Sequence, residues 1–177
     1  MGDTAAAQRL RLLQAEFVQP TRSGPGDGRT PTRAHSTAPI NLGVLQQIQA
    51  AVQEVETHTR AAAPEAGPFT DPRAERVYDW ARQQTAHLDA ERQQAREALI
   101  YRQSMEHALT TGDTSVVRRQ PCPACGCWGL FWREAQHKAV CVNRYCTDEQ
   151  GLARTWTLAH LAQQYIAERN SAAARAT

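Results

Sequence analysis

Cys122-Pro-Ala-Cys125-Gly126 is followed by Cys141-Val-Asn-Arg-Tyr-Cys146, and fifteen residues separate the second cysteine from the third. Two cysteine pairs at roughly this distance are typical of a tetrahedral zinc site, in which each pair lies on its own loop. The usual pairs are C-x2-C, whereas four residues lie inside the second pair here, which predicts a wider second loop. This segment decides the fold of the C-terminal part of the chain, because a bound ion can hold together a module too small to fold alone.

The residues near the first pair suit a tight turn that presents two sulfurs to one ion. Pro123 fixes φ inside this turn, and Gly126 can adopt the positive φ that is needed directly after the second ligand. Between the pairs, residues 130–134 and 136–140 have the composition of two short strands that pair across a turn. Such a hairpin would bring the four thiols together at one end.

The metal ligands predicted from this pattern are Cys122, Cys125, Cys141 and Cys146. Four thiolates leave no open position for water, so we expect a structural zinc ion, one per chain, although a rubredoxin-type iron would also suit them. Cys127 is a rival for the position of Cys125, and His137 is a rival fourth ligand. Two further alternatives are reduced cysteines with no ion and a redox-active Cys-x-x-Cys, and the second lacks the preceding β-α-β pattern of such motifs.

The first pair resembles the first knuckle of zinc ribbons and rubredoxin-like modules. The segment from Arg118 to about Ala162 is similar to a zinc-ribbon segment in small uncharacterised proteins of actinobacteria and their phages. The similar pieces are the Cys-Pro-x-Cys-Gly turn, Cys141-x-Asn143-x-x-Cys146 and Arg154-x-Trp156-x-Leu158-x-x-Leu161-Ala162. This resemblance covers about a quarter of the chain. It implies a zinc-ribbon fold and a phage or prophage origin.

Periodic apolar residues predict that much of the first two thirds of the chain is helical. Residues 4–18 and 40–62 carry apolar side chains three or four apart, and 72–110 form the longest candidate, which Asp71 would cap. Pro, Gly, Ser and Thr dominate 19–39, which predicts a flexible linker. We expect the helices at 40–62 and 72–110 to pack antiparallel, and the apolar faces of all three helices to lack enough partners inside the chain.

The predicted fold is mainly α, built from extended amphipathic helices with a small C-terminal zinc-ribbon β-hairpin and a terminal helix, and is α+β overall. Its expected parts are an N-terminal helix (1–18), a flexible linker (19–39), a helical hairpin or arm (40–113), a zinc-ribbon module with a C-terminal helix (114–170) and a disordered tail (171–177). Thr157 is the predicted N-cap of the terminal helix, after a third short strand. The apolar stripe of that helix is expected to pack on four aromatic residues: Trp128, Phe131, Trp132 and Trp156.

Charge is placed unevenly along the chain, and the cysteine-bearing end is the basic end. Residues 114–177 hold eight basic and four acidic residues, a net charge of +4. This balance favours a nucleic-acid contact, in which basic groups bind phosphates and Trp128 or Trp132 stacks on bases. The basic candidates are Arg118, Arg119, Arg133, Lys138, Arg144 and Arg154. The alternatives are that the tryptophans form core and the basic groups only solvate the surface, or that the chain is a helical interaction or scaffold protein that self-associates or docks on an assembly.

Other classes of protein receive little support from the sequence. No apolar run approaches the ~18 residues needed to span a bilayer, and the N-terminus lacks the features of a signal peptide. We therefore expect a cytoplasmic protein whose thiols stay reduced. No serine lies in a nucleophile motif and no H-E-x-x-H is present, so we expect no enzyme activity, no catalytic residues and no small-molecule substrate.

Overall fold

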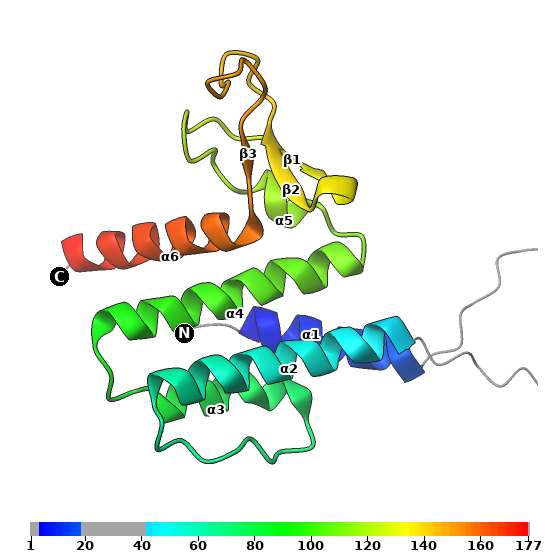
Figure 1. Ribbon diagram of the computed structural model, residues 1–177, viewed down its shortest axis with the longest axis vertical. Coiled ribbons are helices and arrows are strands. Elements are labelled where there is room, and N and C mark those ends of the chain that lie inside the picture. Colours follow the sequence, from blue (N-terminus) through cyan, green and yellow to red (C-terminus); the bar gives the residue numbers. More distant parts are fainter. Residues whose placement is uncertain (1–3, 19–41, 177) are drawn as a thin grey trace, which may run out of the picture.

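The computed structural model describes residues 4–18 and 42–176. The predicted linker 19–39 lies outside the described residues. The helices are α1 (Thr4–Val18), α2 (Leu42–Ala62), η1 (Ala74–Arg76), α3 (Val77–Gln84), α4 (Ala90–Thr110), α5 (Ser115–Arg118), η2 (Glu134–Gln136) and α6 (Leu158–Arg175). The strands are β1 (Leu130–Arg133), β2 (Lys138–Cys141) and β3 (Thr155–Trp156). These elements confirm the predicted α+β class (Figure 1).

The helices α1 to α4 form one packed unit, which we call the helical base (Figure 1). On α1, Leu10 and Leu13 are fully buried, and on α2 the burial of Ile48 and Val55 continues the same core. The side chain of Phe17, which extends the predicted stripe of α1, lies outside the described residues. The apolar faces of α1 and α2 are thus covered within the chain, and the expectation that they lack partners is wrong.

The segment expected to form one long helix over 72–110 is broken in the structure. The carboxylate of Asp71 accepts a hydrogen bond from the backbone N–H of Arg73 (2.9 Å), and only a single 3₁₀ turn follows before α3. Residues 85–89 then separate α3 from α4. The break is stable because Asp89 caps α4 by accepting from the N–H of Arg92 (2.8 Å), and Gln93 donates to the carbonyl of Leu88 (2.7 Å).

Polar pairs fix the direction of α4 against its neighbours. Near one end, Gln47 of α2 donates to Thr110 of α4 (2.7 Å), and further along, Gln103 donates to the carbonyl of Ala51 (3.1 Å). From residue 47 to residue 51 of α2, the partners on α4 run backwards from residue 110 to residue 103. The two helices are therefore antiparallel. The predicted antiparallel packing of these two segments is present between α2 and α4, and α3, which the break separates from α4, also packs against α2.

The strands form a small antiparallel sheet in the order β1-β2-β3, which we call the ribbon together with its loops (residues 121–157). The predicted hairpin is correct, since Leu130 pairs with Cys141 and Arg133 pairs with Lys138 next to the turn at η2. Figure 1 shows the ribbon standing on one side of α4 and α6.

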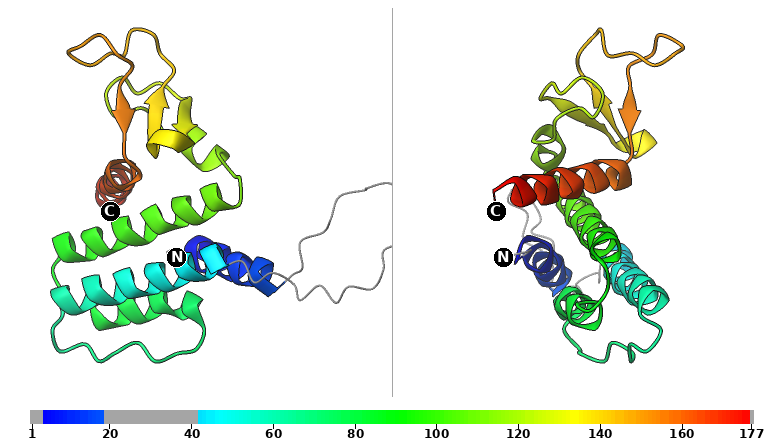
Figure 2. Two further views of the ribbon diagram at one scale, coloured as in Figure 1. Left: turned by 45° about the vertical axis from the view of Figure 1, so that its right-hand side comes forward. Right: turned by 90° about the vertical axis from the view of Figure 1, so that its left-hand side faces the viewer.

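The terminal helix joins the ribbon to the helical base. Thr157 caps α6 as predicted, accepting from the N–H of His160 (3.2 Å). Figure 2 shows α6 crossing α4, and Tyr165 of α6 stacks on Tyr101 of α4 with ring centroids 4.2 Å apart. The helix continues to Arg175, so residues 171–175, expected in a disordered tail, are helical.

A second core lies where α4, α6 and the ribbon meet. Met105 and Ala108 of α4 belong to the same buried cluster as Trp132 of the ribbon and Leu161 of α6. The ribbon therefore shares its core with the helical base. None of the helices in the described ranges is long and apolar enough to cross a membrane.

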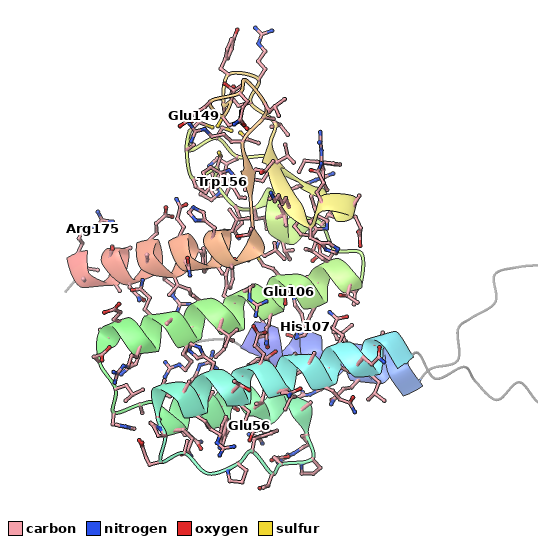
Figure 3. The ribbon with its side chains drawn as sticks, viewed as in Figure 1. Glu56, Glu106, His107, Glu149, Trp156 and Arg175 are labelled. Carbon is pink, nitrogen blue, oxygen red and sulfur yellow. The ribbon has the colours of Figure 1, made fainter. Side chains whose placement is uncertain are left out.

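A buried polar cluster lies on the side of α4 that faces α2 and α3, and Figure 3 labels one of its members, His107. The hydroxyl of Tyr78 donates to Gln103 (3.0 Å), so the Nε2–H of His107 donates to the same hydroxyl oxygen (3.1 Å). The Nδ1 atom, which an added proton would occupy, has no hydrogen-bond partner among the described residues. Burial, together with the positive charges of Arg9 and Arg102, lowers the pKa of His107 to about 4.

This cluster predicts that stability falls with pH below neutrality. The unfolded chain binds a proton at His107 near pH 6.5, whereas the folded chain resists it until about pH 4. Stability is therefore fully present above about pH 6.5 and is lost as pH falls toward 4, by about 3 kcal/mol for this group. Urea unfolding of wild-type protein and His107→Gln at a series of pH values measures the effect. If the free energy of unfolding of His107→Gln falls with pH as steeply as that of the wild-type protein, the prediction is wrong.

Candidate metal centre

Four thiols from the two predicted knuckles meet at the end of the ribbon away from η2. Their sulfurs all lie within 4.8 Å of one another, as the spacing of the pairs predicts. These residues are Cys122, Cys125, Cys141 and Cys146. Three of the thiols are buried and that of Cys125 is exposed. The cluster is consistent with a zinc-ribbon-like site.

The sulfur separations test whether one ion fits between the thiols. Zinc–sulfur bonds of about 2.3 Å imply a tetrahedron with edges of about 3.8 Å. The Sγ atoms of Cys122 and Cys146 are 3.7 Å apart, and those of Cys125 and Cys141 are also 3.7 Å apart. These are two opposite edges of the tetrahedron, so two edges have the length that a tetrahedral ion requires, and the other four are no longer than 4.8 Å. Such an ion would tie the two knuckles together and leave no open position for chemistry.

Local backbone bonds build the first knuckle. The N–H of Gly126 donates to the carbonyl of Cys122 (2.8 Å), and the N–H of Cys122 donates to the carbonyl of Cys127 (2.9 Å). Gly126 has φ of 69°, which confirms the predicted positive φ. A bridge between Pro121 and Trp128 closes the loop. The first pair is thus held by a turn that its own sequence specifies.

The second knuckle is wider and depends on the sheet. The N–H of Cys146 donates to the carbonyl of Asn143 (2.9 Å), which makes the turn inside the pair. The N–H of Cys141 donates to the carbonyl of Arg154, and the N–H of Arg154 donates to the carbonyl of Cys146, both at 3.0 Å. The returning segment before β3 therefore holds both cysteines in place.

The surroundings of the thiols oppose ionisation at the buried positions. Burial raises the pKa of Cys146 to about 11 and also raises the pKa of Cys141. Cys125 differs, because the backbone N–H of Cys127 and the Cys127 thiol lower its pKa to about 6. An ion would have to displace protons from the buried thiols, so its affinity would fall as pH falls.

The two rival ligands have different positions. His137 lies at the η2 turn, at the far end of the hairpin from the cysteines, with a left-handed φ of 48°. Cys127 lies with the cluster: its sulfur is 3.2 Å from that of Cys125 and 3.5 Å from that of Cys141. The structure therefore brings a fifth thiol to the site, next to the exposed Cys125.

The basic residues predicted to contact nucleic acid are all exposed on the ribbon or directly before it. In the helical base, by contrast, half-buried arginines are neutralised: Arg82 binds Glu97 through two hydrogen bonds (2.9 and 3.0 Å), and Arg102 binds Glu54 and Glu106. Within the described residues, no ion pair involves any of the six: Arg118, Arg119, Arg133, Lys138, Arg144 and Arg154. In this part of the chain the basic charge of the six is therefore not neutralised by carboxylates, although Arg154 donates a hydrogen bond to the carbonyl of Thr147 (2.8 Å).

Exposed aromatic side chains lie beside the knuckles. Trp128 is 68% exposed and Tyr145 is 77% exposed, with the guanidinium of Arg144 4.6 Å from the Tyr145 ring centroid. Trp132 is only 8% exposed, so of the two tryptophans predicted to stack on bases only Trp128 is accessible. The expectation that Trp128 and Phe131 pack in the core beneath α6 is wrong, because both are exposed. Tyr145 was missed, although its place inside the Cys141–Cys146 loop is a signal of exposure.

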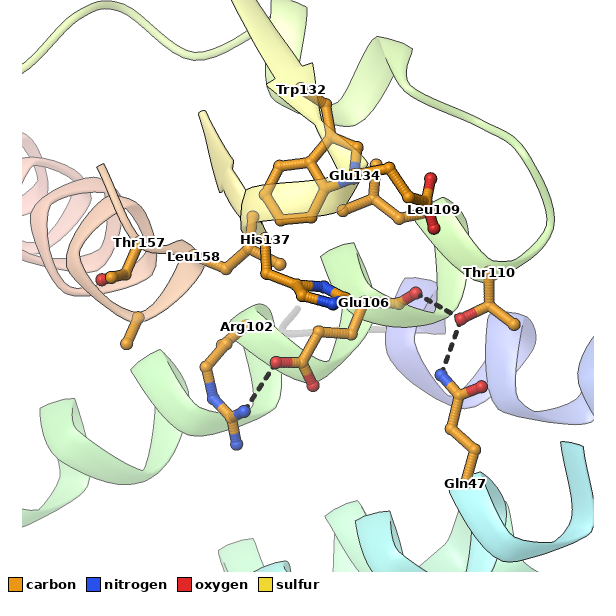
Figure 4. Close-up of a pocket in the computed structure, with 11 residues that line it drawn as sticks. Gln47, Arg102, Glu106, Leu109, Thr110, Trp132, Glu134, His137, Thr157 and Leu158 are labelled. Atoms are coloured by element: carbon orange, nitrogen blue, oxygen red, sulfur yellow. Dashed lines mark hydrogen bonds and ion pairs between the residues drawn. The ribbon is translucent and has the colours of Figure 1, made fainter. Parts of the chain in front are cut away.

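A pocket of about 480 Å³ lies where the ribbon meets α4 and α6 (Figure 4). Trp132 and His137 line its ribbon side, and Arg102 and Glu106 line its α4 side. Burial raises the pKa of Glu106, and Arg102 opposes this by donating a hydrogen bond to it (2.6 Å). The charged groups on the α4 side thus pair with each other across one turn of helix.

No protein-family model, curated protein or solved structure matches the chain. The structure is that of a mainly helical protein with a small three-stranded sheet near the C-terminal end of the described residues, and its four clustered cysteines are consistent with a zinc-ribbon-like site.

Proposed function

We propose that this chain is a non-enzymatic, cytoplasmic protein whose ribbon, held by one structural zinc ion, binds single-stranded nucleic acid. The observation that carries the proposal is a contrast within the described residues: arginines of the helical base form ion pairs with carboxylates, whereas the basic groups of the ribbon form none. Exposed basic side chains bind phosphates, and exposed aromatic rings stack on unpaired bases. Trp128 and Tyr145 are such rings.

Zinc is the metal that the cysteine set favours. Four thiolates form the donor set of closed structural zinc sites, and the 3.7 Å sulfur separations match such a site. The non-enzymatic role rests on the sequence, in which no serine lies in a nucleophile motif and no H-E-x-x-H is present. The phage or prophage origin rests on the Cys-Pro-x-Cys-Gly resemblance alone and stays a prediction.

Salt dependence of oligonucleotide binding tests the proposal. Zinc-loaded protein is titrated into a labelled single-stranded oligonucleotide at several salt concentrations, with fluorescence anisotropy as the readout. Arg133 and Lys138, which face each other across the hairpin, are changed together to Gln. We expect weaker binding and a smaller salt slope, by about 0.7 for each phosphate that the variant no longer neutralises.

The matched control removes the same charge from the helical base. Arg76 and Arg92 are exposed there and pair with nearby aspartates, and changing both to Gln is expected to leave binding nearly unchanged. Trp128→Ala is expected to weaken binding by ~1–3 kcal/mol without changing the salt slope. If wild-type protein shows no binding at low salt, or if the control loses as much as the ribbon variant, the nucleic-acid role is wrong. Concentration-dependent self-association without binding would instead favour the scaffold alternative.

A further inference from the structure

Five sulfurs, one more than a tetrahedral ion needs, gather at the ends of the two knuckles. Four of them form the cluster described above, and the fifth belongs to Cys127. Cys127 follows Gly126, whose positive φ turns the chain back so that both Cys125 and Cys127 face the second knuckle. The surplus thiol is therefore placed by the same turn that places a predicted ligand.

The sulfur separations show which coordination position Cys125 and Cys127 could each fill. A tetrahedral zinc–thiolate edge is about 3.8 Å, and Cys127 is 3.5 Å from Cys141, close to that edge. Cys125 is 3.7 Å from the same sulfur. The two rivals are only 3.2 Å from each other, which is shorter than an edge, so they cannot fill two corners of one tetrahedron at the same time. In this structure the Cys125 sulfur is the one that lies within 4.8 Å of all three other ligands, and Cys127 lies beside it.

We infer that Cys125 and Cys127 are alternative ligands for a single coordination position, with Cys122, Cys141 and Cys146 as the three constant ligands. This inference rests on the proposed zinc site and assigns Cys127 a role in it. At any moment one of the two thiols binds the ion and the other is a free thiol beside it. Cys125 is exposed and Cys127 is half-buried, so the free thiol is within reach of small reagents.

Metal content of serine variants tests this inference. Cys125→Ser and Cys127→Ser are each expected to purify with one zinc per chain, because the remaining thiol completes the site. The double variant, and Cys122→Ser as a control for a constant ligand, are expected to lose it. Cobalt(II) substitution adds a count of the thiolates, since its sulfur-to-metal charge-transfer absorption grows with each bond. Both single variants should keep the full wild-type absorption.

Alkylation of the wild-type protein avoids any effect of substitution on folding. Zinc-loaded protein is treated with iodoacetamide, unfolded with a chelator and mapped by peptide mass spectrometry. We expect one label per chain, divided between Cys125 and Cys127. A label confined to either residue would show one fixed ligand set and overturn the inference.

The outcomes separate this inference from the metal site on which it rests. Zinc in the wild-type protein but not in Cys125→Ser leaves the metal site intact and overturns the role of Cys127. Absence of metal from folded, reduced wild-type protein overturns both. The shared position is supported if both single variants bind zinc while the double variant and Cys122→Ser do not.

Discussion

Replacing Cys122 with serine should release the metal and unfold the ribbon while the helical base stays folded. The binding free energy of structural zinc in small modules is on the order of 10–16 kcal/mol, and it acts as folding free energy. The free energy of unfolding of a whole domain is only ~5–15 kcal/mol, so the other interactions of the ribbon cannot replace the contribution of the ion. Cys122 is also buried within the core shared by the ribbon and α4, so the variant leaves a serine hydroxyl in apolar surroundings.

Hydrogen exchange with peptide resolution distinguishes the two parts of the chain. Amides of β1 and β2 should lose protection in Cys122→Ser and in wild-type protein treated with a chelator. Amides of α2 and α3, which belong to the other core, should keep it. Cys127→Ser is the matched control, because it makes the same atomic change within the cluster. A ribbon that stays protected in Cys122→Ser with no metal bound would show that the ion does not hold the fold.

Replacing Leu10 with alanine should destabilise the helical base strongly. Leu10 lies fully buried on α1 among residues of α2, α3 and α4. Removing such a side chain costs ~2–5 kcal/mol, because its burial is lost and a cavity remains. Urea unfolding followed by far-UV circular dichroism measures the change in the free energy of unfolding.

Leu12 provides a control two residues away on the same helix. It is 54% exposed, so Leu12→Ala makes the same change on the solvent side and should alter the free energy of unfolding by less than ~0.5 kcal/mol. Equal effects of the two substitutions, or none from Leu10→Ala, would mean that α1 is not packed on the base in solution. The apolar stripe of α1 would then be available to a partner, as the scaffold alternative requires.

The parts of this protein that were predictable from the sequence depend on short-range chemistry. The turn at Gly126, the hairpin between the cysteine pairs and the Thr157 cap each involve residues close together in the chain. In such cases the residue type restricts φ or supplies the hydrogen-bonding group directly. The four-cysteine cluster was predictable for the same reason, since the hairpin brings the second cysteine pair back beside the first.

The break in the predicted 72–110 helix was not predictable by the same means. Leu88 keeps an apolar residue on the predicted face, which is interrupted at Gln84 and Glu91, but side chains distant in sequence stabilise a reversal of the chain at residues 85–89. Arg96 donates to Thr85 (2.7 Å) and Arg82 binds Glu97, contacts that exist only when α3 folds back on α4. Tertiary packing and buried polar pairs outweighed local helix propensity.

The sequence by itself determined the four-cysteine cluster, the ribbon hairpin and the helical character of the rest, because each follows from spacing or local conformation. Only the tertiary structure decided that α1 is buried in the base, that Trp132 is core while Trp128 is exposed, and that Cys127 lies against Cys141. These depend on distances between segments far apart in the chain. Whether a side chain is buried depends on how the helices and strands pack together, and it cannot be read from the residue type alone.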